Sequence, residues 1–197
     1  MEKIKEILIG TNNVGKYKEI CALLPKTVRK YSLKEFKISS PEETGKSFKE
    51  NSFIKASYFS KKTNLICLSD DSGLEIDLLG GLPGIYSSRW GGKKNDFDMA
   101  IKRIFREMKK IKKEWKNDNR ANFACCLTIF WPNGKNFSGE GIIKGKISSI
   151  KTGTNGFGYD PIFVPEGYKS TFGEMDPKLK MSIDHRYKAF LKIKNFF

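Results

Sequence analysis

The chain has 197 residues, of which 39% are hydrophobic and 13% aromatic, and its 37 basic and 22 acidic residues give a formal net charge of +15. This length suits one domain with a sizeable core, and the composition excludes a disordered chain. The apolar runs are too short to span a bilayer, and the first ten residues lack the features of a signal peptide. We therefore expect a cytoplasmic protein with no membrane partner.

In chain order, strands and helices are predicted to alternate through the first 78 residues. Apolar runs alternate with segments of helical periodicity, and Gly10 and Pro25 mark two of the boundaries. The predicted elements are a strand over 4–9, a helix over 16–24, a strand over 27–33, a helix over 47–63, and short strands over 65–68 and 74–78.

The second part of the chain predicts a long helix and a hairpin. The helix has an apolar stripe and a lysine-rich face, and Pro132-Asn133-Gly134 marks the hairpin turn. The predicted elements are a loop over 80–84, a helix over 96–115, strands over 121–131, 137–146 and 160–164, and a last helix starting near 184. The pattern indicates an α/β fold, a mixed sheet with flanking helices, in a single domain over residues 1–197.

The positive charge alone does not identify a partner. The basic residues are mostly scattered lysines in a sequence rich in Asn, Ile and Phe, so genome composition explains much of the charge. A basic nucleic-acid-binding module is the alternative from a different functional class, but no recognised nucleic-acid motif appears. We expect that no nucleic acid is required.

The cysteines and the single histidine exclude two common kinds of site. Cys21, Cys67, Cys125 and Cys126 form no C-x-x-C pair, so a zinc site of the usual spacing is excluded and reduced core thiols are expected. A Ser–His–Asp triad would depend on His185 alone, and no G-x-S-x-G motif is present.

A phosphate-binding loop is predicted between the first strand and the first helix. Residues 10–16 read G-T-N-N-V-G-K, which has P-loop spacing, although Tyr17 stands where a P-loop has Ser or Thr. Backbone N–H groups at a helix N-terminus attract phosphate, and Lys16 adds a positive charge. An ordinary capped turn is the alternative interpretation.

Two acidic clusters could serve a hard cation. Asp70 and Asp71 follow an apolar strand, and adjacent carboxylates there suit Mg²⁺ or a general base. Glu42 and Glu43 precede the helix over 47–63. An Asp-rich turn and a helix-entry loop are the structural alternatives.

Two further segments suit recognition of a nucleotide base. The glycine-rich run over 153–161 lets a ligand approach the backbone, and Phe157 or Tyr159 could stack on a base. Asp184 is a natural N-cap for the last helix, which would fix His185 and Arg186 as donors in its first turn. A glycine turn with core aromatics and a structural histidine are the alternatives.

Together these segments resemble the inosine triphosphate pyrophosphatase family. The matching runs occur in the family's order and span nearly the whole chain: 11–16 (TNNVGK), 43–45 with Phe48, Glu50 and Asn51, 70–75 (DDSGLE), 80–90 (GGLPGIYSSRW), 156–161 (GFGYDP), 171–175 (TFGEM) and His185-Arg186. The resemblance implies an elongated α/β fold with two lobes around a central nucleotide-binding cleft, usually as a homodimer.

The resemblance also assigns roles to residues. It implies a magnesium site at Glu43 and Asp71, with Asp71 as the general base. It implies substrate contacts from Thr11, Asn12, Asn13, Val14, Gly15, Lys16, Ser72, Phe157, Gly158, Tyr159, Asp160, Lys180, His185 and Arg186.

The activity implied by the resemblance is Mg²⁺-assisted hydrolysis of ITP, dITP and XTP to the monophosphate and pyrophosphate. A pyrophosphatase acting on other modified nucleotides is the alternative within the same chemistry. The chain departs from the family pattern at Asp184, usually Ser, at Asn122, often Arg with Arg120 close by, and at Gly173, usually Ala.

Overall fold

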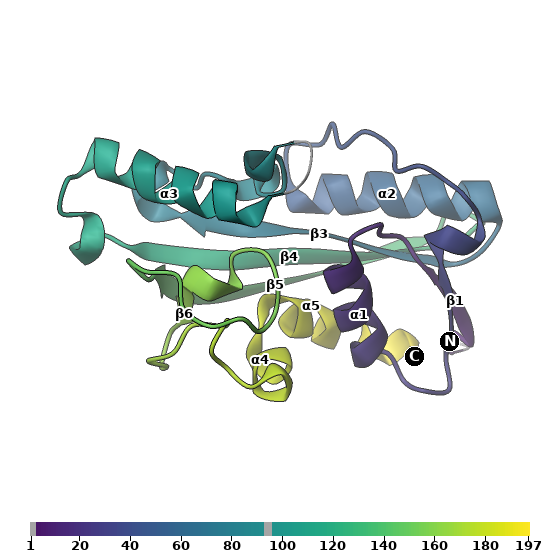
Figure 1. The fold of residues 1–197 in the computed structure, drawn as a ribbon. Helices are drawn as coiled ribbons and strands as arrows, with labels where there is room; N and C mark the ends of the chain where they lie inside the picture. Colours follow the sequence, from purple (N-terminus) through teal and green to yellow (C-terminus); the bar gives the residue numbers. More distant parts are fainter. Residues whose placement is uncertain (1–2, 93–95) are drawn as a thin grey trace. The chain divides into compact units, whose positions relative to one another are not determined.

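The computed structural model describes residues 3–92 and 96–197 and contains a six-stranded mixed sheet (Figure 1). The strands are β1 (Glu6–Ile9), β2 (Arg29–Ser32), β3 (Cys67–Ile76), β4 (Arg120–Phe130), β5 (Asn136–Ile147) and β6 (Phe163–Pro165). Their order is β2-β1-β3-β4-β5-β6, with β1 parallel to β2 and β3, and β5 antiparallel to β6. The predicted mixed α/β sheet is confirmed.

Five α-helices flank the sheet, and none of the helices in the described residues is long and apolar enough to cross a membrane. The helices are α1 (Val14–Leu23), α2 (Phe48–Thr63), α3 (Phe97–Ile111), α4 (Pro177–Ile183) and α5 (His185–Ile193). Short 3₁₀ turns are η1 (Leu33–Glu35), η2 (Asp77–Leu79), η3 (Gly84–Tyr86), η4 (Arg89–Gly91), η5 (Trp115–Asn117), η6 (Asp160–Ile162) and η7 (Lys194–Phe196).

The chain forms two compact units, each assembled from separate segments. Unit 1 contains the residues up to Asp71 together with Cys125–Gly141 and His185–Phe197. Unit 2 contains Ser72–Ala124 and Ile142–Asp184. Strands β3, β4 and β5 therefore each contribute residues to both units.

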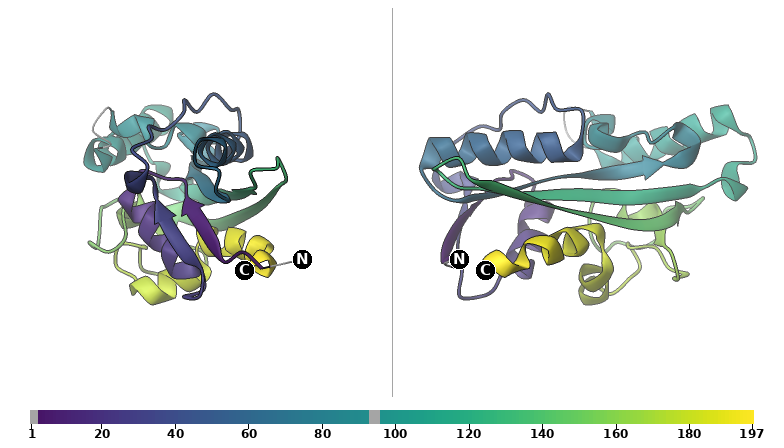
Figure 2. Two further views of the ribbon diagram at one scale, coloured as in Figure 1. Left: turned by 90° about the vertical axis from the view of Figure 1, so that its right-hand side faces the viewer. Right: turned by 180° about the vertical axis from the view of Figure 1, so that it is seen from behind.

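In unit 1 the strands have buried side chains on both of their faces. Leu8 and Cys67 pack with Phe59 of α2 on one face, whereas Ile9 packs with residues such as Ile193 of α5 on the other. Helix α2 lies on one side of the strands, and α1 and α5 on the other (Figure 2). A strand that is covered on both sides buries consecutive residues, as β1 does at Ile7, Leu8 and Ile9.

In unit 2 the apolar stripe of α3 forms much of the core. Ile101, Ile104 and Met108 recur at helical spacing and pack in one cluster with Leu74 and Ile76 of β3. Burying each such side chain contributes about 1.5–3 kcal/mol to folding. The opposite face of α3 is left to solvent, as its lysines predict.

Side-chain caps fix where the helices begin. Asn13 accepts a hydrogen bond from the backbone N–H of Lys16, so α1 begins at Val14, two residues earlier than predicted. Ser47, Asp96 and Asp176 cap α2, α3 and α4 in the same way. The predicted helix over 96–115 ends at Ile111, because the chain leaves helical geometry after it and residues 115–117 form a separate turn.

Three predictions about elements are corrected. The two strands predicted over 65–68 and 74–78 are one continuous strand, β3, and the acidic run lies inside this strand rather than after its end. Residues 160–162 form η6, and β6 begins only at Phe163. Helix α4 was not predicted, although Asp176 and Pro177 are a typical helix start.

The four cysteines are free thiols, as expected. Cys67, Cys125 and Cys126 are buried. Burial raises the pKa of the Cys67 thiol to about 12, which keeps it protonated at neutral pH.

Candidate active site

The loop that follows β1 carries the predicted phosphate-binding residues into α1. Gly10 at its start donates its N–H to the Leu68 carbonyl at 2.8 Å and accepts from the Ser69 hydroxyl at 3.1 Å. A Cβ at position 10 would lie 2.1 Å from the Ser69 Oγ, so this approach of β1 to β3 requires glycine. The Thr11 hydroxyl accepts from the N–H of Asn13, which orders the loop, and Asn12 and Val14 are exposed.

Lys16, on the first turn of α1, enters a buried ion network. Its Nζ lies 3.1 Å from the Asp70 Oδ2, and the Arg186 Nη2 lies 3.2 Å from the same oxygen. The Arg186 Nη1 also pairs with Glu19 of α1. The network therefore joins α1, β3 and α5 within unit 1.

The charges in this network decide the ionisation of Asp70. Burial would raise the pKa of the fully buried Asp70 carboxyl, but Lys16 and Arg186 hold that pKa well below its usual value. Asp70 is therefore an anion at neutral pH that fixes two cations. Arg186 is 1% exposed, and its guanidinium contacts these carboxylates.

A second polar cluster surrounds Asp71, the next residue of β3. The Lys55 Nζ lies 2.5 Å from the Glu43 Oε1 and 3.5 Å from the Asp71 Oδ1. Asn51, one helical turn before Lys55, donates to the Asp71 Oδ2 at 3.1 Å and accepts from the Gly45 N–H at 2.8 Å. Two carboxylates from distant segments thus converge on one ammonium group.

Opposing effects set the charge states in this cluster. Burial would lower the pKa of Lys55, but Asp71, Asp70 and Glu43 hold it above its ordinary value. Burial raises the pKa of Asp71, and Lys55 only partly opposes this. A carboxylate with a raised pKa is the better proton acceptor, as a general base requires.

Sequence reasoning missed the residues that hold the acidic pair in place. Asn51 and Lys55 occupy successive turns of α2 on a face that also buries Ser52 and Ser60. A helix whose buried face is mostly polar is unusual, because buried polar groups need partners. That pattern was visible in the sequence as helical spacing, but the partners were not.

In unit 2 the structure brings together Phe157, Asp160 and Lys180. The Lys180 Nζ lies 2.7 Å from the Asp160 Oδ2 and 5.4 Å from the centre of the Phe157 ring, and both charged groups are buried. The Asp160 carboxylate also accepts from the Phe157 N–H at 2.9 Å. Gly156 has φ +72°, and a Cβ there would lie 2.0 Å from the Asp160 Oδ2, so the turn requires glycine.

Three other predicted substrate residues belong to unit 2. Gly158 and Tyr159 lie between Phe157 and Asp160 in the sequence, and Ser72 lies on β3. Tyr159 is 3% exposed, and its hydroxyl donates to the Ser87 carbonyl at 2.7 Å, so its ring is a packed element of the core. Gly158 has φ +67° and is half-buried. Ser72 is half-buried and directly follows Asp71.

Asp184 and His185 stand at the junction of α4 and α5 and are both buried. Asp184 has an extended backbone (φ −71°, ψ 173°) and directly precedes α5, as an N-cap residue must. Whether its side chain caps α5 stays a prediction.

Comparisons with known proteins place the chain among the proteins that its motifs resemble. A dITP/XTP pyrophosphatase of Caulobacter vibrioides is 39% identical over 189 residues, covering 96% of both chains. Another, of Rhodospirillum centenum, is 40% identical over 188 residues, covering 95% of this chain and 92% of the relative.

Solved structures agree with these sequence comparisons. A HAM1 protein from Coxiella burnetii matches with a TM-score of 0.87 at 33% identity and 98% coverage of both chains. The Staphylococcus aureus Ham1 protein matches with a TM-score of 0.85, also at 33% identity, covering 98% of this chain and 97% of that one. The model of the Ham1 family matches residues 7–196, and the chain therefore belongs to the Ham1 family.

Proposed function

We propose that this protein hydrolyses dITP, ITP and XTP to the nucleoside monophosphate and pyrophosphate. The names of the relatives support the substrate class. The single structural observation that carries the chemistry is the convergence of Glu43 and Asp71 on Lys55, beside the pair of Lys16 and Asp70.

The loop of residues 11–16 is the proposed site for the triphosphate. The N-terminus of α1 offers backbone N–H groups, and phosphate oxygens are attracted to the positive end of a helix. Lys16 adds an ammonium group that Asp70 holds at the first turn. Held there, the outer phosphates would leave the α-phosphorus for attack.

The donor set around Lys55 fits Mg²⁺. Glu43 and Asp71 supply carboxylate oxygens, the ligands that Mg²⁺ prefers, and their oxygens already face one cation. Among residues 3–92 and 96–197, no three His, Cys, Asp or Glu side chains are grouped to hold an ion. Substrate phosphates and water would complete the shell, as is usual for Mg²⁺. When bound, Mg²⁺ neutralises charge on the phosphate oxygens.

In the proposed reaction Asp71 acts as the general base. Its carboxylate takes a proton from water as the water oxygen bonds to the α-phosphorus. The bond from that phosphorus to the bridging oxygen of the β-phosphate breaks, and pyrophosphate leaves with the electron pair. Asn51 holds the second carboxylate oxygen in place, and burial favours proton acceptance.

The family resemblance implies base contacts from Phe157, Lys180, His185 and Arg186, and we retain these four residues as proposed contacts. Phe157 offers a ring face, and Lys180 and His185 offer donors that suit the C6 oxygen of inosine and xanthine but not the amino group of adenine. Each buried polar group left unpaired costs about 1–3 kcal/mol. Two such conflicts would therefore give a discrimination of roughly 30-fold to 10⁴-fold against adenine nucleotides. Arg186, placed by its carboxylate partners, would contribute a donor from the same helix end.

Asp184 tests this account of specificity. If its carboxylate caps α5, replacing it by Ser, another strong cap, leaves the preference for ITP over GTP nearly unchanged. A wild-type protein that hydrolyses GTP as well as ITP, and becomes selective on Asp184→Ser, would place the carboxylate in the base pocket instead.

The decisive experiment is a panel of nucleoside triphosphates with Mg²⁺, with products separated by anion exchange. We expect IMP and pyrophosphate from ITP, and much slower turnover of ATP and GTP. Release of orthophosphate from ITP before any pyrophosphate would overturn the proposed geometry. We also propose a homodimer, which light scattering on the purified protein would test.

A further inference from the structure

A dense positive surface lies on α3 and the turn that follows it, and none of its residues has a role in the proposed catalysis. Eight of the fifteen residues from 102 to 116 are Lys or Arg and only two are acidic. All eight basic residues are exposed. We call these eight the α3 basic face: Lys102, Arg103, Arg106, Lys109, Lys110, Lys112, Lys113 and Lys116.

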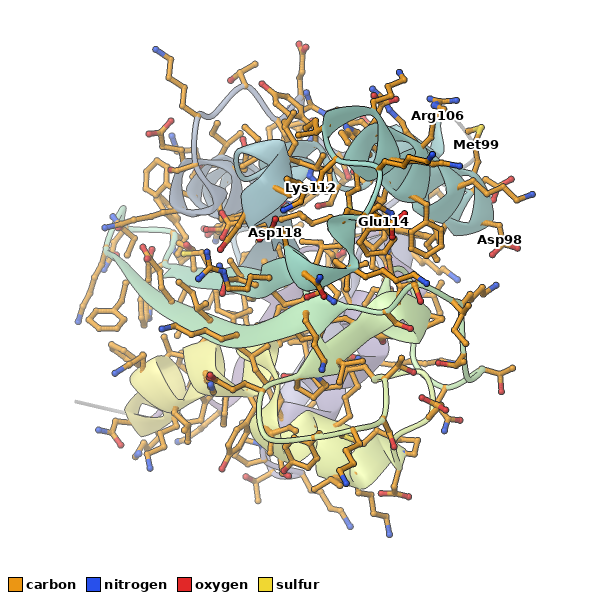
Figure 3. The ribbon with its side chains drawn as sticks, turned by 90° about the vertical axis from the view of Figure 1, so that its left-hand side faces the viewer. Asp98, Met99, Arg106, Lys112, Glu114 and Asp118 are labelled. Atoms are coloured by element: carbon orange, nitrogen blue, oxygen red, sulfur yellow. The ribbon has the colours of Figure 1, made fainter. Side chains whose placement is uncertain are left out.

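Helical geometry gathers part of this face into one stripe. Lys102, Arg106 and Lys109 are spaced by four and then three residues, so they project from the same side of α3. Figure 3 shows Arg106 pointing outward from the helix, away from the strands beneath it. From Lys102 to Lys109 the stripe spans roughly 10 Å along the helix.

Neighbouring acids offset little of this charge. Glu107 pairs with both Arg106 and Lys110, and Asp118 pairs with Lys112. The side chains of Arg106 and Lys110 are 64% and 63% exposed, so these pairs are weak and screened by salt. The segment remains strongly positive.

The surroundings of α3 argue against two classes of anionic partner, membranes and single-stranded nucleic acids. A basic amphipathic helix binds membranes by inserting its apolar face, but Ile101, Ile104 and Met108 of α3 are buried in the core of unit 2. Single strands are bound by stacking bases on aromatic rings. The two aromatic residues of the segment, Phe105 and Trp115, instead stack on each other, and Trp115 is buried.

A duplex needs neither insertion nor stacking, because its phosphates present one charge per about 1.7 Å of axis. The groove decides between DNA and RNA, because the major groove of B-DNA is wide enough for an α-helix to lie between its two rows of phosphates, whereas that of duplex RNA is too narrow. The geometry points to a second function for this protein: the α3 basic face binds double-stranded DNA through its phosphates, without sequence preference. This inference does not depend on the proposed hydrolysis.

The test compares two variants of equal charge. The stripe variant carries three substitutions on α3, Lys102→Glu/Arg106→Glu/Lys109→Glu. The unit 1 variant carries three substitutions at exposed lysines of unit 1, Lys26→Glu/Lys61→Glu/Lys188→Glu. Each substitution replaces a positive charge by a negative one and lowers the net charge by two, so both variants fall from +15 to +9. Fluorescence anisotropy with a labelled 20-base-pair DNA would be measured in EDTA between 50 and 200 mM salt. Circular dichroism and ITP hydrolysis verify folding.

We expect the wild type to lose about 500-fold in affinity over this salt range, as five phosphate contacts would give. The stripe variant should bind at least tenfold more weakly at 50 mM salt, with a log–log salt slope shallower by about 2–3. The unit 1 variant should stay within about threefold of the wild type. If the glutamate stripe variant fails to fold, the corresponding triple Gln variant replaces it.

Three outcomes would overturn the inference. Equal losses in both variants would mean that net charge alone drives binding. No binding by the wild type at 50 mM salt would remove the function. Tighter binding to a 20-base-pair RNA duplex, or to vesicles of anionic phospholipid, than to the DNA would assign the face to a different partner.

Discussion

At the scale of single residues, Asp71 carries the most specific expectation. Asp71→Asn keeps the shape of the side chain and an oxygen that can accept the hydrogen bond from Asn51. It removes the proton acceptor and an anionic metal ligand. We expect pyrophosphate release to fall by at least ~10²–10⁴-fold, the usual share of general-base help. Asp118→Asn, on the surface, is the matched control and should be silent. Near-normal turnover in a folded Asp71→Asn protein would remove Asp71 from the mechanism.

Its neighbour Asp70 should instead govern acid stability. Its pKa is lower in the folded protein than in the unfolded chain, so its stabilising effect is complete above the unfolded pKa of about 3.9 and is lost as pH falls toward the folded pKa. Asp70→Asn also leaves Lys16 and Arg186 facing a neutral group, which costs roughly 3–5 kcal/mol for a buried pair. Thermal unfolding from pH 3 to pH 7 should show the deficit at neutral pH and its narrowing below about pH 4. A deficit independent of pH would contradict this ionisation.

Glu43 should act mainly through the metal. Glu43→Gln keeps the side chain's length but weakens its attraction for a cation, so we expect activity to fall and to recover partly as Mg²⁺ is raised. Glu42→Gln, on the adjacent exposed residue, serves as the control. Activity of Glu43→Gln that does not respond to Mg²⁺ would argue against a metal ligand at this position.

At the scale of elements, the junction of β1 and β3 shows how tightly the site is built. Gly10→Ala would drive a methyl group into the Ser69 Oγ, the Cys67 Sγ and the Phe59 ring. We expect a loss of about 1–3 kcal/mol in unfolding free energy, as for other overpacked cores. The double variant Gly10→Ala/Ser69→Ala should recover part of this loss, because the nearest of the three contacts is gone. Strict additivity of the two changes would show that Ser69 is not the obstacle.

The same elements show what the sequence could and could not predict. The helix starts next to Ser47 and Asp96 were predicted from the sequence, and α2 was found at nearly its true length, whereas α1 begins two residues before its predicted start and α3 ends four residues before its predicted end. Strand β3 was split in two because paired aspartates have low strand propensity. Asp70 is held in a buried strand by Lys16 and by Arg186, which is more than a hundred residues later, and no local pattern contains these contacts.

The candidate site was likewise only partly visible in the sequence. Motif residues such as Lys16 and Asp71 could be named from the family resemblance. The arrangement in which Lys55 joins Glu43 to Asp71 depends on the packing of α2 against β3, which only the fold determines. Helix α4 was missed because its seven residues are too few for a periodic signal.

At the scale of the whole molecule, each unit has hydrophobic clusters of its own, and three continuous strands contribute to both units. Ile193 belongs to the core of unit 1 and Ile104 to that of unit 2, while β3, β4 and β5 contribute to both units. We expect one cooperative unfolding transition. Ile193→Ala and Ile104→Ala should each lower the free energy of unfolding by roughly 2–5 kcal/mol, as is usual for a buried large-to-small change. Calorimetry that resolves two transitions, each moved by only one variant, would show independent units.

The charged side chains of the candidate site in unit 1 also affect how a metal ion and a nucleotide would bind together. Four acidic side chains, Glu19, Glu43, Asp70 and Asp71, face three cations, Lys16, Lys55 and Arg186. The formal sum of these seven charges is one negative charge, so the cluster by itself does not attract an incoming polyanion. At the proposed site we therefore expect Mg²⁺ and the nucleotide to favour each other's binding, and thermodynamic reciprocity makes the two enhancements equal. Titration calorimetry with a non-hydrolysable ITP analogue should find the same factor whether Mg²⁺ or the nucleotide is added first.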